Sequence, residues 1–283
     1  MKLINILNLI RVFHWSKNLY IFIPLFFSQE IFKVELNALV NLFIIFSFAA
    51  SCVYILNDIH DYKSDKKNRW KRNRPIAKGT VSINQATILF FSLLSILVLN
   101  LFFTNSKILN YIIAAYFISN FFYTTILKNI FPINIIILIF FYYLRVLAGS
   151  LYFDIEISNW LLIFVLTSSL ILIIGKKIID QKYKKVKLPT KKQLSTILVL
   201  VAVFQCFIYG IFCLDPDTLK KYGEYFIYSY FFVITGTVRY IYIIKKIKIT
   251  SDQILLFLGD KILRTTIVLY LFYLYAVFNL FIL

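Results

Sequence analysis

Three aspartates at the end of a long apolar stretch carry the clearest chemical signal in the sequence. They are Asp58, Asp61 and Asp65, with Asn57 directly before them. At about 100° per residue, a helix would place the three carboxylates within about 60° of one another, with Asn57 beside that face. Carboxylates this close repel one another unless a cation lies between them. Oxygen ligands without clustered His or Cys favour Mg²⁺, which takes one or two carboxylates together with substrate phosphates.

The pattern therefore predicts a magnesium site that also holds a diphosphate-bearing substrate. Its predicted metal ligands are Asn57, Asp58, Asp61 and Asp65, and we expect the three aspartates to act in catalysis. The segment that follows is rich in Lys and Arg, and Arg72 and Arg74 are candidates for contacts with phosphate oxygens. The alternative is a solvated helix end with alternating charges. However, a carboxylate near hydrocarbon is unfavourable, and so is the crowding of three carboxylates. A bound cation would offset both costs, so we favour the metal site.

A second polar group follows a later apolar stretch. Lys176 and Lys177 lie within one helical turn of Asp180. The spacing suits a second half-site, for a phosphate or a second magnesium ion. The alternative is an ordinary cytoplasmic helix end with membrane-flanking lysines, and the pattern alone favours neither.

Isolated polar residues add four more candidates for substrate binding. Arg145 stands inside an apolar run, where a charged side chain usually faces the interior of a bundle or a polar cavity. Snorkelling to the membrane surface is the alternative for Arg145. Arg239 raises the same question closer to a helix end. Lys17 and Asn18 precede the first long apolar segment and either anchor it at the membrane surface or turn into the site.

The composition requires these residues to be positioned by membrane helices. Hydrophobic residues make up 60% of the 283-residue chain, and the mean hydropathy is +0.80. Apolar runs of about 20 residues are long enough to cross a bilayer as helices. We predict an all-α integral membrane protein with nine spans, at about 19–36, 38–56, 83–103, 108–127, 130–151, 159–176, 194–213, 225–244 and 263–282.

The distribution of charge predicts the orientation of these spans. When the nine spans are threaded alternately, all but five of the 31 basic residues fall on one side. The exceptions are Lys33, Lys107, Lys220 and Lys221 on the other side and Arg145 within a span. The basic side is therefore predicted to be cytoplasmic. The net charge of +18 then reflects topology and the lipid surface, and we expect no nucleic-acid partner.

We accordingly expect a multi-pass protein of a bacterial inner membrane, with its N-terminus in the cytoplasm. Residues 1–283 would form one catalytic domain, and the cytoplasmic loops at about 58–82 and 177–193 would carry the site. These loops follow the second and sixth spans, which is the pattern of two related halves. The sequence does not determine the oligomeric state, and a homo-oligomer is one alternative.

The motifs together resemble the UbiA-type prenyltransferase superfamily, and within it the polyprenyl-phosphate (decaprenyl-phosphate) phosphoribosyltransferases. The resemblance is carried, in order along the chain, by His14–Asn18 with Pro24-Leu25, Asn57–Asp65, Arg74–Gly79, Leu144–Gly149, Lys176–Asp180, Arg239-Tyr240 and Asp252–Leu263. It implies nine helices around a lipid-open chamber, with Mg²⁺ at the first motif. It also implies transfer of ribose 5-phosphate from phosphoribosyl diphosphate to a polyprenyl phosphate, which supplies a lipid-linked pentose for cell-envelope glycans.

The sequence departs from this family pattern in its second half. The family usually has an aromatic residue where Ile178 stands, a Glu where Asp180 stands, and a longer Gly-Glu-Pro-type run where Ile249–Asp252 stands. An aromatic prenyltransferase is the main alternative activity, because it too expels diphosphate held by magnesium. The additional cations Lys17, Arg145 and Lys176-Lys177 favour a donor with an extra phosphate. A transporter would instead concentrate polar or helix-breaking residues at mid-span.

Overall fold

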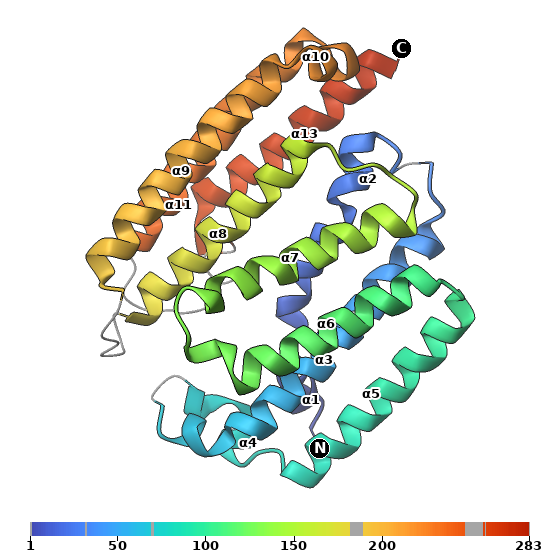
Figure 1. The fold of residues 1–283 in the computed structure, drawn as a ribbon, viewed down its shortest axis with the longest axis vertical. Helices are drawn as coiled ribbons and strands as arrows, with labels where there is room; N and C mark the ends of the chain where they lie inside the picture. Colours follow the sequence, from blue (N-terminus) through green and yellow to red (C-terminus); the bar gives the residue numbers. More distant parts are fainter. Residues whose placement is uncertain are drawn as a thin grey trace. The chain divides into compact units, whose positions relative to one another are not determined.

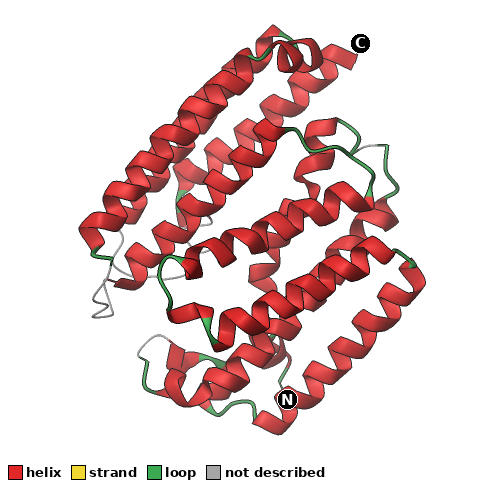
Figure 2. Cartoon of the chain, in the orientation of Figure 1, coloured by secondary structure: helices red, strands yellow, loops and turns green. Residues whose placement is uncertain are grey.

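The regular structure of the described residues is entirely helical (Figures 1 and 2). The computed structural model describes residues 2–31, 33–68, 71–181, 189–246, 257 and 259–282. They form two compact units, Met1–Glu156 and Ile157–Leu283. The sequence predicted a single domain made of two related halves, and the boundary between the units falls just before the predicted sixth span.

The first unit is built from four long helices and several shorter helical segments. In chain order these are α1 (Leu3–Leu9), η1 (Val12–Phe22), α2 (Ile23–Ser28), α3 (Leu36–Lys66), η2 (Lys71–Asn73), α4 (Pro75–Lys78), α5 (Ile83–Thr104), α6 (Lys107–Thr125), η3 (Leu127–Asn129) and α7 (Ile133–Tyr152). Helix α3 packs against α5, α6 and η1, and α7 packs against α6, η1 and α2.

The described residues of the second unit also include four long helices. Its elements are α8 (Asn159–Gln181), α9 (Lys191–Leu214), α10 (Pro216–Tyr222), η4 (Glu224–Tyr228), α11 (Ser229–Lys246) and α13 (Lys261–Ile282). Helix α9 packs between α8 and α11, and α11 also packs against α13.

Side-chain caps set where several of these helices begin. Ser82 accepts a hydrogen bond from the backbone N–H of Gln85, and the Gln85 side chain accepts one in return from the backbone N–H of Ser82. Thr190 and Gln193 form the same reciprocal pair at the start of α9. Each pair satisfies two backbone donors that have no partner within the helix.

The predicted all-helical membrane fold is confirmed, but the predicted count of nine spans is not. Seven helices of the described residues are long and apolar enough to cross a membrane. The predicted span 108–127 is the helix α6, which is not among the seven. The predicted span 19–36 is not one helix, because η1 and α2 end at Ser28 and α3 begins at Leu36. Apolarity along the sequence does not distinguish side chains that face lipid from side chains packed inside the unit. Helix η1 is of the second kind, because it packs against α3 and α7.

Two helices extend further than predicted into the polar segments. Helix α3 continues ten residues past the predicted end of its span and reaches Lys66, so the aspartates lie on a helix and not in a loop. Helix α8 likewise continues to Gln181. No Gly or Pro interrupts either extension, so nothing in these segments forces the backbone out of the helix. Residues 69–70 and 182–188 of the two predicted loops lie outside the described residues.

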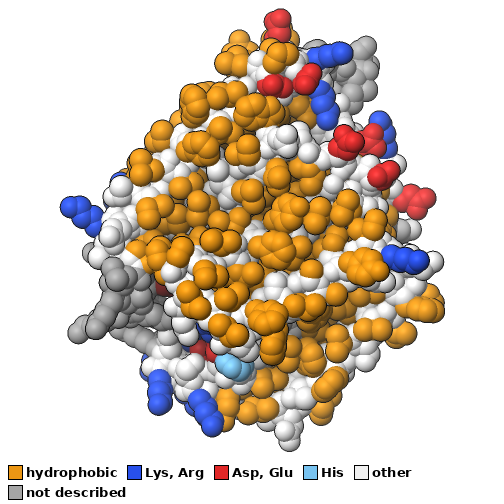
Figure 3. Space-filling model, viewed as in Figure 1, with side chains coloured by type: hydrophobic (Ala, Val, Ile, Leu, Met, Phe, Trp, Pro, Cys, Tyr) orange, Lys and Arg blue, Asp and Glu red, His pale blue; other side chains and the backbone are white. Residues whose placement is uncertain are grey.

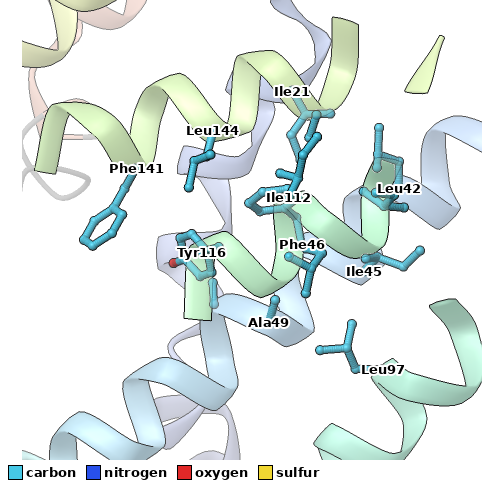
Figure 4. Packing of buried hydrophobic residues seen from close by; sticks show 14 of the residues in the cluster. Ile21, Leu42, Ile45, Phe46, Ala49, Leu97, Ile112, Tyr116, Phe141 and Leu144 are labelled. Carbon is cyan, nitrogen blue, oxygen red and sulfur yellow. The ribbon is translucent and has the colours of Figure 1, made fainter. Parts of the chain in front are cut away.

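A core of apolar side chains holds the first unit together (Figure 4). Phe141 and Leu144 of α7 and Tyr116 of α6 pack with Phe46 of α3 and Ile21 of η1 in one buried cluster. Apolar side chains, in orange, also cover much of the face that Figure 3 shows. Phe103 on α5, for example, is 80% exposed. Exposed apolar surface this extensive is typical of helices that contact lipid.

Candidate functional site

Asp58 and Asp65 form a buried carboxylate pair on α3 that shares one arginine. Each residue is 2% exposed. Nη1 of Arg74 donates hydrogen bonds to Oδ1 of Asp58 at 3.0 Å and to Oδ2 of Asp65 at 2.6 Å. The sequence explains the backbone conformation of Arg74, because Arg74 precedes Pro75 and a residue before proline is held extended. Its φ of −62° and ψ of 143° show that conformation. The predicted helix face is thus observed for these two residues.

Asp61 has different partners. Its carboxylate forms an ion pair with Lys128 of η3 and lies 3.2 Å from Nδ1 of His60. Lys71 completes the cluster, with its amine 3.5 Å from Oδ1 of Asp65. The three aspartates are therefore neutralised in two groups, with Asp58 and Asp65 in one and Asp61 in the other. The sequence analysis did not select Lys128, because nothing in the local pattern of the α6–α7 connection indicates that it reaches α3.

Arg11 also belongs to this site, although no pattern in the sequence singles it out. Its Nη2 donates to Oδ1 of Asp58, and its guanidinium lies over the ring of Tyr54, 4.7 Å from the ring centroid. Tyr54 is one helical turn before Asp58 on α3. Arg11 stands just ahead of the predicted His14–Asn18 motif, and that adjacency was the one available signal. Its left-handed backbone, with φ of 53°, has no sequence signature in a non-glycine residue.

The carboxylate pair fits a divalent cation. Oδ2 of Asp58 is buried and has no hydrogen-bond partner among the described residues. The ligand set is oxygen only, and a bound metal would share the carboxylates of Asp58 and Asp65 with Nη1 of Arg74, which contacts one oxygen of each. Two carboxylates plus substrate phosphates are a usual coordination for Mg²⁺. In the described part of the chain, no three His, Cys, Asp or Glu side chains converge as a metal-binding group. A metal here would therefore depend on ligands from the substrate.

Asn57 has a positioning contact in this structure. Its Oδ1 accepts a hydrogen bond from the hydroxyl of Thr124 on α6. This contact fixes α6 against the polar end of α3, 67 residues away in the sequence. The prediction that Asn57 binds metal is not tested by this contact.

The structure brings two predicted substrate residues, Arg145 and Asn18, into direct contact. Nε of Arg145 on α7 donates to Oδ1 of Asn18 in η1 at 2.9 Å. Asn18 in turn donates to Ser47 of α3 at 3.0 Å. Arg145 also donates to the backbone carbonyl of Phe141 at 2.7 Å and to the hydroxyl of Tyr116 at 3.3 Å. Arg145 is 4% exposed, which excludes snorkelling to the surface.

The remaining predicted residues of the first unit lie nearer its surface. Lys17 is half-buried in η1, one residue before Asn18, and Arg72 is exposed in η2. Both lie on elements that contact α3. Arg72 forms no ion pair with the aspartates among the described residues.

The second predicted half-site belongs to the second unit. Lys176 is exposed on α8, and Lys177 and Asp180 are half-buried, while Ile178 and Ile179 pack in the core of that unit. The spacing of Lys176, Lys177 and Asp180 on one helix is as predicted, and their role stays a prediction.

Arg239 pairs with a carboxylate of its own unit. Its Nε and Nη2 donate to the two oxygens of Asp260 at 3.0 and 2.7 Å. The hydrogen bond from Arg239 holds the pKa of Asp260 below its usual range. Oδ1 of Asp260 also accepts from the backbone N–H of Leu263 and so caps α13. This pair joins the second half of α11 to the start of α13. Residues 252–256, at the beginning of the last family motif, lie outside the described residues.

Comparison with known proteins shows the family. Residues 21–262 match the model of the UbiA prenyltransferase family, so the chain belongs to that family. Membership and the seven apolar helices together make it an integral membrane protein. The structure of a UbiA homolog from Archaeoglobus fulgidus bound to GPP and Mg²⁺ has a similar fold. Its TM-score is 0.70 at 15% identity, covering 97% of this chain and 99% of that one.

Sequence relatives carry a more specific name. The decaprenyl-phosphate phosphoribosyltransferase of Corynebacterium glutamicum is 30% identical over 48% of this chain and 41% of the relative. The protein of that name from Mycolicibacterium smegmatis is 28% identical over 62% of this chain and 58% of the relative. The chain thus matches about half the length of these relatives.

Proposed function

We propose that this protein transfers ribose 5-phosphate from phosphoribosyl diphosphate to a polyprenyl phosphate, in a reaction that depends on Mg²⁺ and releases diphosphate. An oxygen of the lipid phosphate attacks the anomeric carbon, and the bond from that carbon to the diphosphate oxygen breaks. The leaving diphosphate keeps the electron pair. The lipid phosphate is already largely ionised at neutral pH, so the reaction needs no strong general base.

The observation that carries the proposal is the concentration of cations around the aspartates. Four cationic side chains contact the three carboxylates, and these are Arg11, Lys71, Arg74 and Lys128. Positive charge therefore exceeds negative charge in the cluster. Such a cluster suits a ligand with several phosphate oxygens, because charge-assisted hydrogen bonds to phosphate are strong.

Within this proposal, Asp58 and Asp65 hold the metal, and Arg74 meets the phosphates. Magnesium, when bound, neutralises the charge that grows on the leaving diphosphate. Lys17 and Arg72 are candidates for the phosphates of the donor. Arg145 is buried and donates to Oδ1 of the buried Asn18, which supports a role for Arg145 in positioning η1 beside α3 and α7.

The second unit supplies the remaining candidates. Lys176, Lys177 and Asp180 are candidates for a second half-site, for a phosphate or a second magnesium ion. We further propose that the site faces the cytoplasm of a bacterial inner membrane, where it supplies a lipid-linked pentose for cell-envelope glycans. The excess of basic residues on one predicted side supports that orientation.

The test is a transfer assay with purified protein in lipid nanodiscs. It contains Mg²⁺, a polyprenyl phosphate and phosphoribosyl diphosphate labelled in the ribose. We expect labelled lipid and free diphosphate in equal amounts, and no reaction with chelator present. Asp58→Asn should abolish the reaction, while Glu35→Gln should not, because Glu35 is exposed at the other end of the same helix.

A parallel reaction distinguishes the alternative activity. It offers a polyprenyl diphosphate and an aromatic acid in place of the two substrates. Prenylated acid here, with no labelled lipid in the first assay, would show an aromatic prenyltransferase and refute the proposed donor. Loss of activity in Asp58→Asn would then still assign the diphosphate site.

A further inference from the structure

The side chain of Arg11, in the N-terminal segment, contacts Asp58, the most buried carboxylate of the site. Arg11 reaches Asp58 from the junction between α1 and η1, with its own side chain 18% exposed and that of Asp58 1% exposed. The family resemblance in the sequence did not include Arg11, and the proposed reaction does not require it. Its contact with Asp58 is therefore a separate feature to explain.

The backbone around Arg11 is held in an unfavourable conformation. Its φ and ψ of 53° and 53° are left-handed, which costs a non-glycine residue about 1 kcal/mol or more. Ser51 of α3 holds the residues on both sides of it. The hydroxyl of Ser51 accepts from Nε1 of Trp15 at 3.0 Å, and its one proton is shared between the carbonyls of Ile10 at 2.9 Å and Ser47 at 2.8 Å. Strain that is maintained by its surroundings is typical of functional positions.

These anchors direct Arg11 along one face of α3. Ser51 lies seven residues, about two turns, before Asp58, and Tyr54 lies between them on the same face. The guanidinium of Arg11 lies over the Tyr54 ring and ends at Oδ1 of Asp58. The arrangement positions the charge of Arg11 at one carboxylate oxygen.

The guanidinium groups of Arg11 and Arg74 both contact one oxygen of Asp58, and the other oxygen has neither as a partner. Oδ1 of Asp58 accepts from Arg11 and from Arg74, whereas Oδ2 is buried without a hydrogen-bond partner among the described residues. The two arginines repel each other, and together with Lys71 they place three positive charges against the two carboxylates of Asp58 and Asp65. A diphosphate has more negative oxygens and would be a better partner for one of them.

We propose that Arg11 competes with the divalent cation for Asp58, and that it moves to the diphosphate when metal and diphosphate bind together. Arg11 is thus a further ligand-binding residue of the site. When no metal is bound, Arg11 balances the negative charge of the Asp58 carboxylate. It thereby favours joint binding of metal and diphosphate over binding of metal alone. This inference rests on the proposed function, because it requires the magnesium–diphosphate site at Asp58 and Asp65.

The experiment measures two affinities without turnover. Binding of Mn²⁺ alone is followed by electron paramagnetic resonance, and binding of inorganic diphosphate in saturating Mg²⁺ is followed by calorimetry. For Arg11→Gln we expect Mn²⁺ to bind more tightly, because a competing cation is gone. We expect diphosphate to bind about tenfold more weakly, because one charge-assisted hydrogen bond is lost. The opposite signs of the two changes are the signature of the proposal.

Two control variants test whether the effect comes from the contact between Arg11 and Asp58. One removes a positive charge elsewhere on α3, and the other removes a hydrogen bond that anchors the N-terminal segment. Lys63→Gln removes one positive charge from the same helix, at an exposed side chain that lies over the ring of Tyr62. Both affinities should stay within about twofold of the wild type, because exposed charges are screened by salt. Trp15→Phe removes the hydrogen bond to Ser51 without changing charge. It should lower the thermal stability and leave the ratio of the two affinities close to the wild-type ratio.

Each outcome decides the inference. If both affinities of Arg11→Gln change in the same direction, or match those of Lys63→Gln, Arg11 is a structural anchor and the proposal is wrong. If the wild type binds neither Mn²⁺ nor diphosphate, the proposed function fails together with it. If Arg11→Gln does not fold, Arg11→Lys takes its place. It keeps the charge but loses the planar fork and should show both opposite changes at smaller amplitude.

Discussion

Asp58 and Asp65 lie two helical turns apart on α3 and accept hydrogen bonds from the same nitrogen, Nη1 of Arg74. Arg74 therefore acts as a counter-ion between two buried carboxylates. The third aspartate, Asp61, pairs with Lys128. This division of the acidic motif into a pair and a single residue leads to different expectations for each aspartate.

We predict that Asp58→Asn and Asp65→Asn each lower the transfer rate about 100-fold or more, because each removes half of the buried carboxylate pair. Asp61→Asn should have a smaller effect, since Asp61 is more exposed and its charge is balanced by Lys128. The measurement is the rate of label transfer to lipid at saturating Mg²⁺. Equal losses in all three variants would contradict the division into two groups. The elution volume on gel filtration controls for folding.

Removal of Arg74 should destabilise the protein. Arg74→Gln leaves Asp58 and Asp65 buried with less positive charge between them, and breaking a buried ion pair from one side costs about 3–5 kcal/mol. Arg11 and Lys71 remain as partial compensation, so the loss should fall at the low end of that range. Thermal denaturation in detergent measures it. Arg72→Gln, at an exposed neighbouring position, is the control and should change stability by less than about 0.5 kcal/mol.

Three helical glycines should respond to alanine in a set order. A Cβ at Gly149 would collide with the backbone carbonyl of Ile21, and one at Gly175 with the hydroxyl of Tyr240. One at Gly236 would meet a methyl carbon of Thr266 at 3.8 Å, an ordinary contact. Backbone cannot move aside as a side chain can, so Gly149→Ala should destabilise most and Gly175→Ala less. Gly236→Ala should be neutral or stabilising by up to about 1 kcal/mol from helix propensity.

The melting temperatures of the three variants check this order. A Gly149→Ala protein as stable as Gly236→Ala would show that η1 does not pack closely on α7. The distinction bears on the proposed function, because η1 contains Lys17 and Asn18, which are predicted to bind substrate.

The pair between Arg239 and Asp260 predicts a pH-dependent contribution to stability. Because the pKa of Asp260 is lowered in the folded state, the stabilisation is present above the unfolded value of about 3.9 and is lost as pH falls through the lowered value. Asp260→Asn removes the charge but keeps a good helix cap. It should melt slightly below the wild type at pH 7, and the two should converge at acidic pH. A constant difference at every pH would mean that the cap, and not the ion pair, matters.

The sequence by itself determined the class of protein and the position of its main chemical motif. Apolar runs predict membrane helices, because lipid forces each backbone amide to find a partner within its own segment. Helical periodicity predicts that Asp58 and Asp65 share a face, because that relationship depends only on residues within two turns. The extended conformation of Arg74 follows from the proline after it.

Only the tertiary structure decided which distant residues complete the site. Lys128 reaches Asp61 from 67 residues away, and Arg145 reaches Asn18 from 127 residues away. Arg11 reaches Asp58 through a left-handed backbone that Ser51 holds in place. The segment predicted as the first span, 19–36, became the end of η1 together with α2, and Asn18 just before it bonds to Ser47 of α3 and Arg145 of α7. Local pattern limits what a short segment can form, but the packing of helices decides which of their side chains meet.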